Sequence, residues 1–185
     1  MVSYELSLIL CITSIVVMTG SLDLREIVAA QSTGSFDWNW WKQPLAFVIF
    51  VIATFAETNR HPFDFAECEP ELVGGFHTEY SSMKFALFFL GEYCAMIVMA
   101  CLTTVFFLGG ADVPFLSTES EPWWLQLGFF MGKTSIWLLL FLLVRWTLPR
   151  FRFDQLMALG WKVMLPLALL NVFGTGALAS LGLYD

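Results

Sequence analysis

Charged residues are scarce in this chain. Only 14% of its 185 residues are charged, and nine are Lys or Arg. Soluble domains carry charge on about a quarter of their residues, so an ordinary water-soluble domain is excluded. Hydrophobic residues make up 58% of the chain, aromatic residues 17%, and the mean hydropathy is +0.72. We therefore predict an all-α, polytopic integral membrane protein that forms a single membrane domain over residues 1–185.

Other expected features are also missing. The four cysteines form no C-x-x-C pair, and Cys11, Cys94 and Cys101 lie inside apolar runs, which argues against a metal cluster or a disulfide framework. The amino terminus lacks the basic region of a signal peptide, and Glu5 is an acid where transit peptides avoid acids. No Gly-rich phosphate loop or internal repeat is present. We therefore expect a membrane chain inserted without a cleaved address.

Five apolar runs are candidates for membrane-spanning helices, because one crossing takes about 20 apolar residues. They cover residues 2–20, 44–59, 83–109, 125–148 and 161–183. The second run is short and reaches span length only if Glu57 to Asn59 continue it into a protein-lined region. Pro44 suits the first turn of that helix. Pro149 and Gly160 predict the limits of the last loop.

The basic residues predict the orientation of the chain. Segment 145–162 holds four of the nine, Arg145, Arg150, Arg152 and Lys162. By the positive-inside rule this segment faces the cytoplasm or the matrix. Alternation then places residues 110–124 outside, and the acidic segment 57–82 and the amino terminus inside. The acidic loop between the second and third helices is therefore expected on the same side as the basic loop.

The stretch ETNRHPFDFAECEPELVGG, residues 57–75, concentrates acids in an otherwise apolar chain. Five of them fall within fifteen positions: Glu57, Asp64, Glu67, Glu69 and Glu71. Carboxylates a few Å apart cannot all ionise without cost, and Arg60, four residues before Asp64, opposes that effect. We expect a coupled set whose protonation responds to charge that arrives or leaves nearby.

Further acids lie within or beside the apolar runs. Glu92 falls inside the third run, Glu79 lies just before it, and Glu5 lies near the inner end of the first. An ionisable group in a span is costly and points to function by default. Acids at several depths predict a path for protons, while a solvated acidic loop and a site for a hard cation remain alternatives. Because His61 and His77 lack the Glu-x-x-His spacing of di-metal bundles, we predict no metal ligands.

An aromatic stripe precedes Glu92 at helical spacing and consists of Phe85, Phe88 and Phe89. One interpretation is contact with lipid or with a neighbouring helix. The other is an apolar wall for a flat hydrophobic ligand such as a quinone, which would end beside an acid.

The run AETNRHPFDFAECEPELVGGFHTEYSSMKFALFFLGEY, residues 56–93, resembles the signature of one known family. That family is the quinone-site membrane subunit of respiratory complex I, the proton-pumping NADH:quinone oxidoreductase. Its pattern reads E-x-N-R-x-P-F-D-x-x-E-x-E-x-E-L-V-x-G-x-x-x-E-Y. VSYE at residues 2–5 and LPRFRFDQLMALGWKVMLPL at residues 148–167 resemble family segments in the same order. The chain is similar to the C-terminal five-helix part of the family's subunit, as one half of a split subunit or as a fragment.

The resemblance implies roles for individual residues. Those implied in proton coupling are Glu5, Glu57, Arg60, Asp64, Glu67, Glu69, Glu71, Glu79 and Glu92. Those implied at the quinone are Arg60, Phe63, Phe85, Phe88 and Phe89.

The resemblance also implies an assembly. Ubiquinone would be the substrate at a shared site, this chain would bind no cofactor alone, and NADH, FMN and iron–sulfur clusters would belong to partner subunits. Expected partners are a chain supplying the N-terminal spans, peripheral-arm quinone-site subunits, antiporter-like membrane subunits and lipid, but not nucleic acid. The expected location is the mitochondrial inner membrane, with the bacterial plasma membrane as the alternative. Alternative functions are a stand-alone proton or cation transporter and a membrane subunit of a related membrane-bound hydrogenase.

Overall fold

The computed structural model describes residues 2–32, 37–58, 60, 62–63, 83–112, 122–149 and 151–182. The elements in these ranges are all helical, which confirms the all-α prediction, and none is a strand. In chain order they are α1 (Val2–Thr19), α2 (Leu24–Ala29), α3 (Asn39–Lys42), α4 (Pro44–Glu57), α6 (Met83–Phe107), α7 (Trp123–Thr147), α8 (Phe153–Leu159), the π-helical segment η3 (Gly160–Met164) and α9 (Leu165–Ser180).

The five predicted apolar segments are all helical, but they differ in length. Three helices, Met83–Phe107, Trp123–Thr147 and Asp154–Ser180, are long and apolar enough to cross a bilayer. At a rise of about 1.5 Å per residue, the 25 residues of α6 exceed a hydrocarbon core of about 30 Å. The 18 residues of α1 and the 14 of α4 fall short of it. Crossing by these two shorter helices therefore stays a prediction.

The predicted loop up to Gly160 was wrong. The last helix begins at Phe153 and continues through Gly160, which is buried and has helical angles of φ −60° and ψ −54°. Pro166 lies in the first turn of α9 and donates no backbone N–H, and the preceding turn is the wider π-helical segment η3. A helix end in apolar surroundings would leave several N–H and C=O groups without partners, so a continuous helix is favoured over a break.

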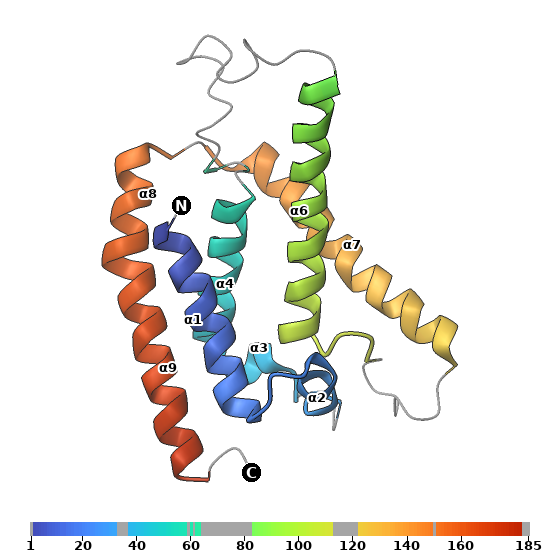
Figure 1. Ribbon diagram of the computed structural model, residues 1–185, viewed down its shortest axis with the longest axis vertical. Helices are drawn as coiled ribbons and strands as arrows, with labels where there is room; N and C mark the ends of the chain where they lie inside the picture. The colour runs from blue at the N-terminus through green and yellow to red at the C-terminus, as the bar shows by residue number, and fades with distance from the viewer. Residues whose placement is uncertain are drawn as a thin grey trace.

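Figure 1 shows α1, α4 and α9 side by side, with α6 upright beside them and α7 crossing obliquely. A stripe of mostly small residues recurs every three or four positions on the buried face of α1: Tyr4, Ser7, Cys11, Ser14 and Ile15. Small side chains allow close approach of helix backbones in membranes. Ser14 Oγ also donates to Gln43 Oε1 over 2.8 Å, which ties the start of α4 to α1.

The core consists of two apolar clusters. One contains Phe50 of α4 and Phe107 of α6, whose ring centroids lie 5.2 Å apart. The other contains Phe55 of α4 and Phe141 of α7, at 4.4 Å. On the outside of α6 and α7, large apolar side chains such as Leu87 and Leu139 are more than 60% exposed. Apolar surface of this extent is expected to face lipid or partner chains.

The carboxyl end of α6 receives hydrogen bonds from the connection between α1 and α4. Gln31 Nε2 donates to the carbonyl of Val105 over 3.1 Å, and its Oε1 accepts from the N–H of Gly109 over 3.0 Å. Asn39 Nδ2 donates to the carbonyl of Phe106 over 2.8 Å. The last carbonyls of a helix have no partner within the helix, so these buried amides supply what the backbone lacks.

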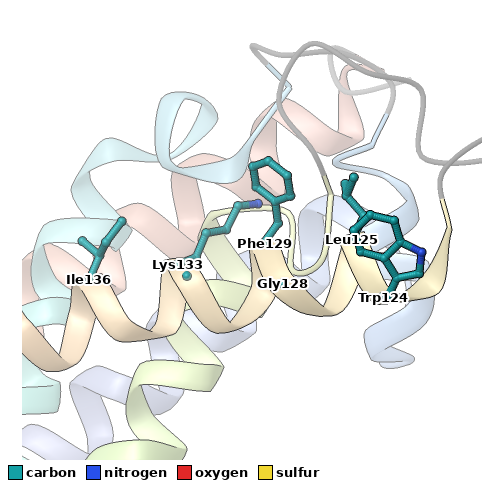
Figure 2. Close-up of a pocket in the computed structure, with 7 residues that line it drawn as sticks. Trp124, Leu125, Gly128, Phe129, Lys133 and Ile136 are labelled. Carbon is teal, nitrogen blue, oxygen red and sulfur yellow. The ribbon is translucent and has the colours of Figure 1, made fainter.

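Lys133 of α7 completes this arrangement. Its Nζ donates to the carbonyls of Leu108, Gly110 and Asp112 over 2.7, 3.2 and 2.7 Å. The same atom lies 4.5 Å from the ring centroid of Trp38. Figure 2 shows the side chain extending from α7 toward the loop that follows α6. All three ammonium protons therefore have carbonyl acceptors, and one side chain joins α7 to the end of α6.

We predict that Lys133→Met lowers the free energy of unfolding of the chain by about 2 kcal/mol, because buried carbonyls lose their donor. Thermal or denaturant unfolding in detergent measures this change. Lys84→Met removes the same charge from an exposed position near the other end of α6 and serves as the control. Equal stabilities of the two variants would contradict the prediction.

Candidate functional site

An ion pair at the start of the acidic segment is the centre of the candidate site. Arg60 Nε lies 2.5 Å from Glu92 Oε1, and the two side chains are 10% and 20% exposed. The guanidinium carbon of Arg60 also lies 4.9 Å from the ring centroid of Tyr93, the residue after Glu92. The segment after α4 is thereby fastened to α6 by a largely buried charge pair and a cation–π contact.

The backbone after Arg60 is held by contacts with the segment before α8. The N–H of Phe63 donates to the carbonyl of Arg60 over 2.8 Å, which closes a turn. The ring of Phe63, 5% exposed, stacks on Phe151 with centroids 5.6 Å apart and an interplanar angle of 18°. The N–H of Phe151 donates to the carbonyl of Pro62 over 3.2 Å. These contacts limit how far Arg60 can move away from Glu92.

A second group of polar side chains lies where α1 begins and α4 ends. Glu57 is the last residue of α4, and Glu5 lies in the first turn of α1. The two carboxyl groups are close enough to interact electrostatically, and the buried phenol of Tyr4 lies within range of both. Figure 1 places the start of α1 and the end of α4 at the same end of the bundle. Glu5 and Glu57, which are distant in sequence, therefore belong to one site.

The predicted aromatic stripe lies on α6. The rings of Phe85 and Phe89 have centroids 4.9 Å apart, and those of Phe89 and Tyr93 lie 6.0 Å apart. Phe88 is on the same helix and is 50% exposed. The ladder Phe85, Phe89 and Tyr93 thus leads along one side of α6 to Arg60. A flat apolar molecule could lie along such a ladder and meet a charged pair at its end.

Several predicted site residues lie outside the described residues: Asp64, Glu67, Glu69, Glu71 and Glu79. The structure in turn adds Tyr4 and Tyr93, which sequence reasoning missed because a tyrosine in an apolar helix gives no signal of its own. Lys133 was missed as well, although a lone lysine inside an apolar run is the kind of signal that reveals a special role.

A groove of about 460 Å³ runs along α7 beside Lys133. Gly128 and Gly132 form part of its lining, and a Cβ added at either glycine would meet open space. Figure 2 shows Trp124, Phe129 and Ile136 along the same stretch of helix. The groove has almost no polar lining apart from Lys133, whose ammonium is already occupied. It is therefore distinct from the charged site at Arg60.

The fold and this site define a multi-pass, all-α membrane protein with a charge pair and several carboxylates at one end of its helices. Over residues 1–176 the sequence matches the family described as NADH dehydrogenase, and the chain belongs to that family. This is the family that the sequence motif resembled.

The chain is similar to bacterial proteins named as the H-type membrane component of NADH-quinone oxidoreductase. It is 56% identical to the protein of Leptospira biflexa over 93% of this chain and 49% of the relative. It is 47% identical to a protein of Cytophaga hutchinsonii, over 96% of this chain and 52% of the relative. A protein of Geobacter metallireducens is 48% identical, over 98% and 50%. The chain thus spans about half the length of the curated relatives it matches.

We predict that Glu92→Gln destabilises the chain by about 3 kcal/mol, because it leaves the buried guanidinium of Arg60 without its counter-ion. The double variant Arg60→Met with Glu92→Met buries no charge at this point and is expected to recover part of that loss. Denaturant unfolding of the single and double variants measures both effects.

Glu26→Gln, at an exposed acid of α2, is the matched control for the loss of a carboxylate. If Glu92→Gln were as stable as Glu26→Gln, the ion pair would have no structural weight.

Proposed function

We propose that this chain is part of the membrane subunit of NADH:quinone oxidoreductase, complex I, that helps form the quinone chamber and couples quinone reduction to proton translocation. The relatives named above are subunits of an NADH-quinone oxidoreductase, a redox enzyme. The observation that carries the proposal is the largely buried pair of Arg60 and Glu92, which joins the acid-rich segment to a membrane-spanning helix. The two alternatives, a stand-alone transporter and a hydrogenase subunit, are not favoured by these relatives.

In the proposed coupling, the pair Arg60 and Glu92 responds to charge. Reduction of a quinone brings electrons, and a negative charge near Arg60 competes with Glu92 for the guanidinium. A carboxylate that loses part of its cationic partner binds a proton more readily. Glu92 would therefore take up a proton as the quinone is reduced and release it when the pair forms again.

The remaining carboxylates would extend this path. Glu57 and Glu5 already interact electrostatically, so a proton gained by one changes the proton affinity of the other. The acids predicted from the motif, Asp64, Glu67, Glu69, Glu71 and Glu79, would belong to the same coupled set. Phe85, Phe88 and Phe89 would border the quinone, and Phe63 would hold the turn that carries Arg60.

The chain would act without a redox group of its own. NADH, FMN and iron–sulfur clusters would be held by partner subunits and supply the electrons, with ubiquinone as the acceptor. Partner chains would be the peripheral-arm subunits, the antiporter-like subunits and whatever polypeptide supplies the other half of the relatives' length. Because the relatives named above are bacterial, a bacterial plasma membrane is favoured over the mitochondrial inner membrane.

We predict that Glu57→Gln lowers NADH:quinone reductase activity of the assembled complex by about tenfold, the scale expected when a proton-transfer group is removed. NADH oxidation by membranes, with a soluble quinone as acceptor, measures the rate. Assembly is monitored by migration on a native gel.

Two comparisons make the result specific. Glu57→Asp keeps a carboxylate and is expected to retain more activity than Glu57→Gln, while Glu26→Gln is expected to leave the rate unchanged. Full activity of Glu57→Gln in an intact assembly would remove Glu57 from the proton path.

A further inference from the structure

A cavity of about 240 Å³ lies beside Arg60, between α6 and α7. Its walls are mainly apolar side chains from both helices: Tyr93, Met96, Ile97, Leu138, Phe141 and Leu142. Its two charged lining residues are Arg60 and Arg145. The cavity therefore combines hydrocarbon walls with two guanidinium groups.

One of these groups has hydrogen-bonding capacity left over. Arg60 is only 8% exposed, and its Nη2 atom is buried with no acceptor among the residues that the structure describes. Glu92 contacts the same guanidinium at Nε. A buried donor of a charged group is costly when it has no acceptor. Because Arg60 lines the cavity, an occupant with an oxygen acceptor could satisfy Nη2.

The charges at the cavity favour an anion. Arg60 and Arg145 contribute two positive charges, and Glu92 contributes one negative charge to the ion pair. Arg145 makes no ion pair within the described part of the chain. The local sum is therefore positive, and a neutral ligand would leave this charge uncompensated.

The position of the cavity indicates the kind of anion. Arg145 lies in the last turn of α7, and the next residue, Trp146, is 81% exposed. Exposed tryptophans beside basic residues are typical of the headgroup level of a membrane. Two wall residues, Ile97 and Leu142, are 48% and 45% exposed, so the cavity continues into the outer apolar surface of the two helices.

We propose that this cavity binds an anionic phospholipid, with the phosphate at Arg60 and Arg145 and an acyl chain along Ile97 and Leu142. Basic pockets between transmembrane helices are suited to such headgroups on the inner side of the membrane. The bound lipid supplies the acceptor that Nη2 of Arg60 lacks and fills the gap between α6 and α7. The proposal does not depend on proton coupling, because it needs only the cavity and its two cations.

The test uses the intact assembly that contains this chain, reconstituted with phosphatidylglycerol or phosphatidylcholine carrying a photoreactive acyl chain. Illumination and peptide mapping locate the labelled residues. We expect phosphatidylglycerol to label the segments of α6 and α7 that line the cavity, and Arg145→Gln to weaken the labelling by about fivefold, the effect of one basic residue near a membrane surface. Lys162→Gln removes an equal charge from η3, outside the cavity lining, and is expected to leave labelling unchanged.

A second pair of variants tests the shape of the cavity. Leu142→Trp fills it without changing charge and is expected to abolish the labelling. Leu139→Trp places the same side chain on the exposed surface of α7, outside the cavity lining, and is expected to have no effect. This pair keeps the proposal testable if Arg145→Gln impairs folding.

Several results would overturn the proposal. Equal labelling by phosphatidylcholine would show an ordinary lipid contact, and no labelling would show that a protein segment fills the cavity. Displacement of the lipid by a short-chain quinone would assign the cavity to the quinone. Competition by inorganic phosphate at the same concentration as the lipid would assign it to a free anion.

Discussion

Polar groups placed among hydrocarbon need partners, and α6 is the helix on which this constraint acts most strongly. At its carboxyl end, Gln31 and Asn39 donate to its final carbonyls, and Lys133 donates to the carbonyls around the turn that follows. Nearer its amino end, Glu92 pairs with Arg60. Because water cannot take the place of these partners in a membrane, the connections around α6 are held in place by chemistry as well as by packing.

This arrangement explains how one site can be both stable and responsive. The turn that carries Arg60 is fixed by its own hydrogen bond and by the stack of Phe63 on Phe151. The guanidinium has three kinds of neighbour: a carboxylate, the ring of Tyr93 and an apolar cavity. A fixed backbone with a charged group at such a boundary can change its electrostatic partners without a change of fold. The proposed roles in proton coupling and in lipid binding both depend on this property.

The helices were largely predictable from the sequence, because long apolar runs have few other solutions in a bilayer. The predicted limits of 44–59 and 83–109 lie close to those of α4 and α6. The limit at Gly160 was wrong, since glycine and proline signals carry less weight where a broken helix would expose backbone groups to hydrocarbon. The roles of Lys133, Tyr4 and Tyr93 were not predictable, because each depends on which helix lies opposite.

The sequence by itself determined the class of the protein, its all-α fold, its family and the acid-rich motif that contains Arg60. Composition and a long specific motif are local properties, so they can be read along the chain. Only the tertiary structure decided that Arg60 pairs with Glu92, that Glu5 lies near Glu57, and that Arg60 and Arg145 share a cavity. Those pairings depend on how α1, α4, α6 and α7 pack together, and apolar helices that face lipid and protein alike carry too little pattern to specify that packing.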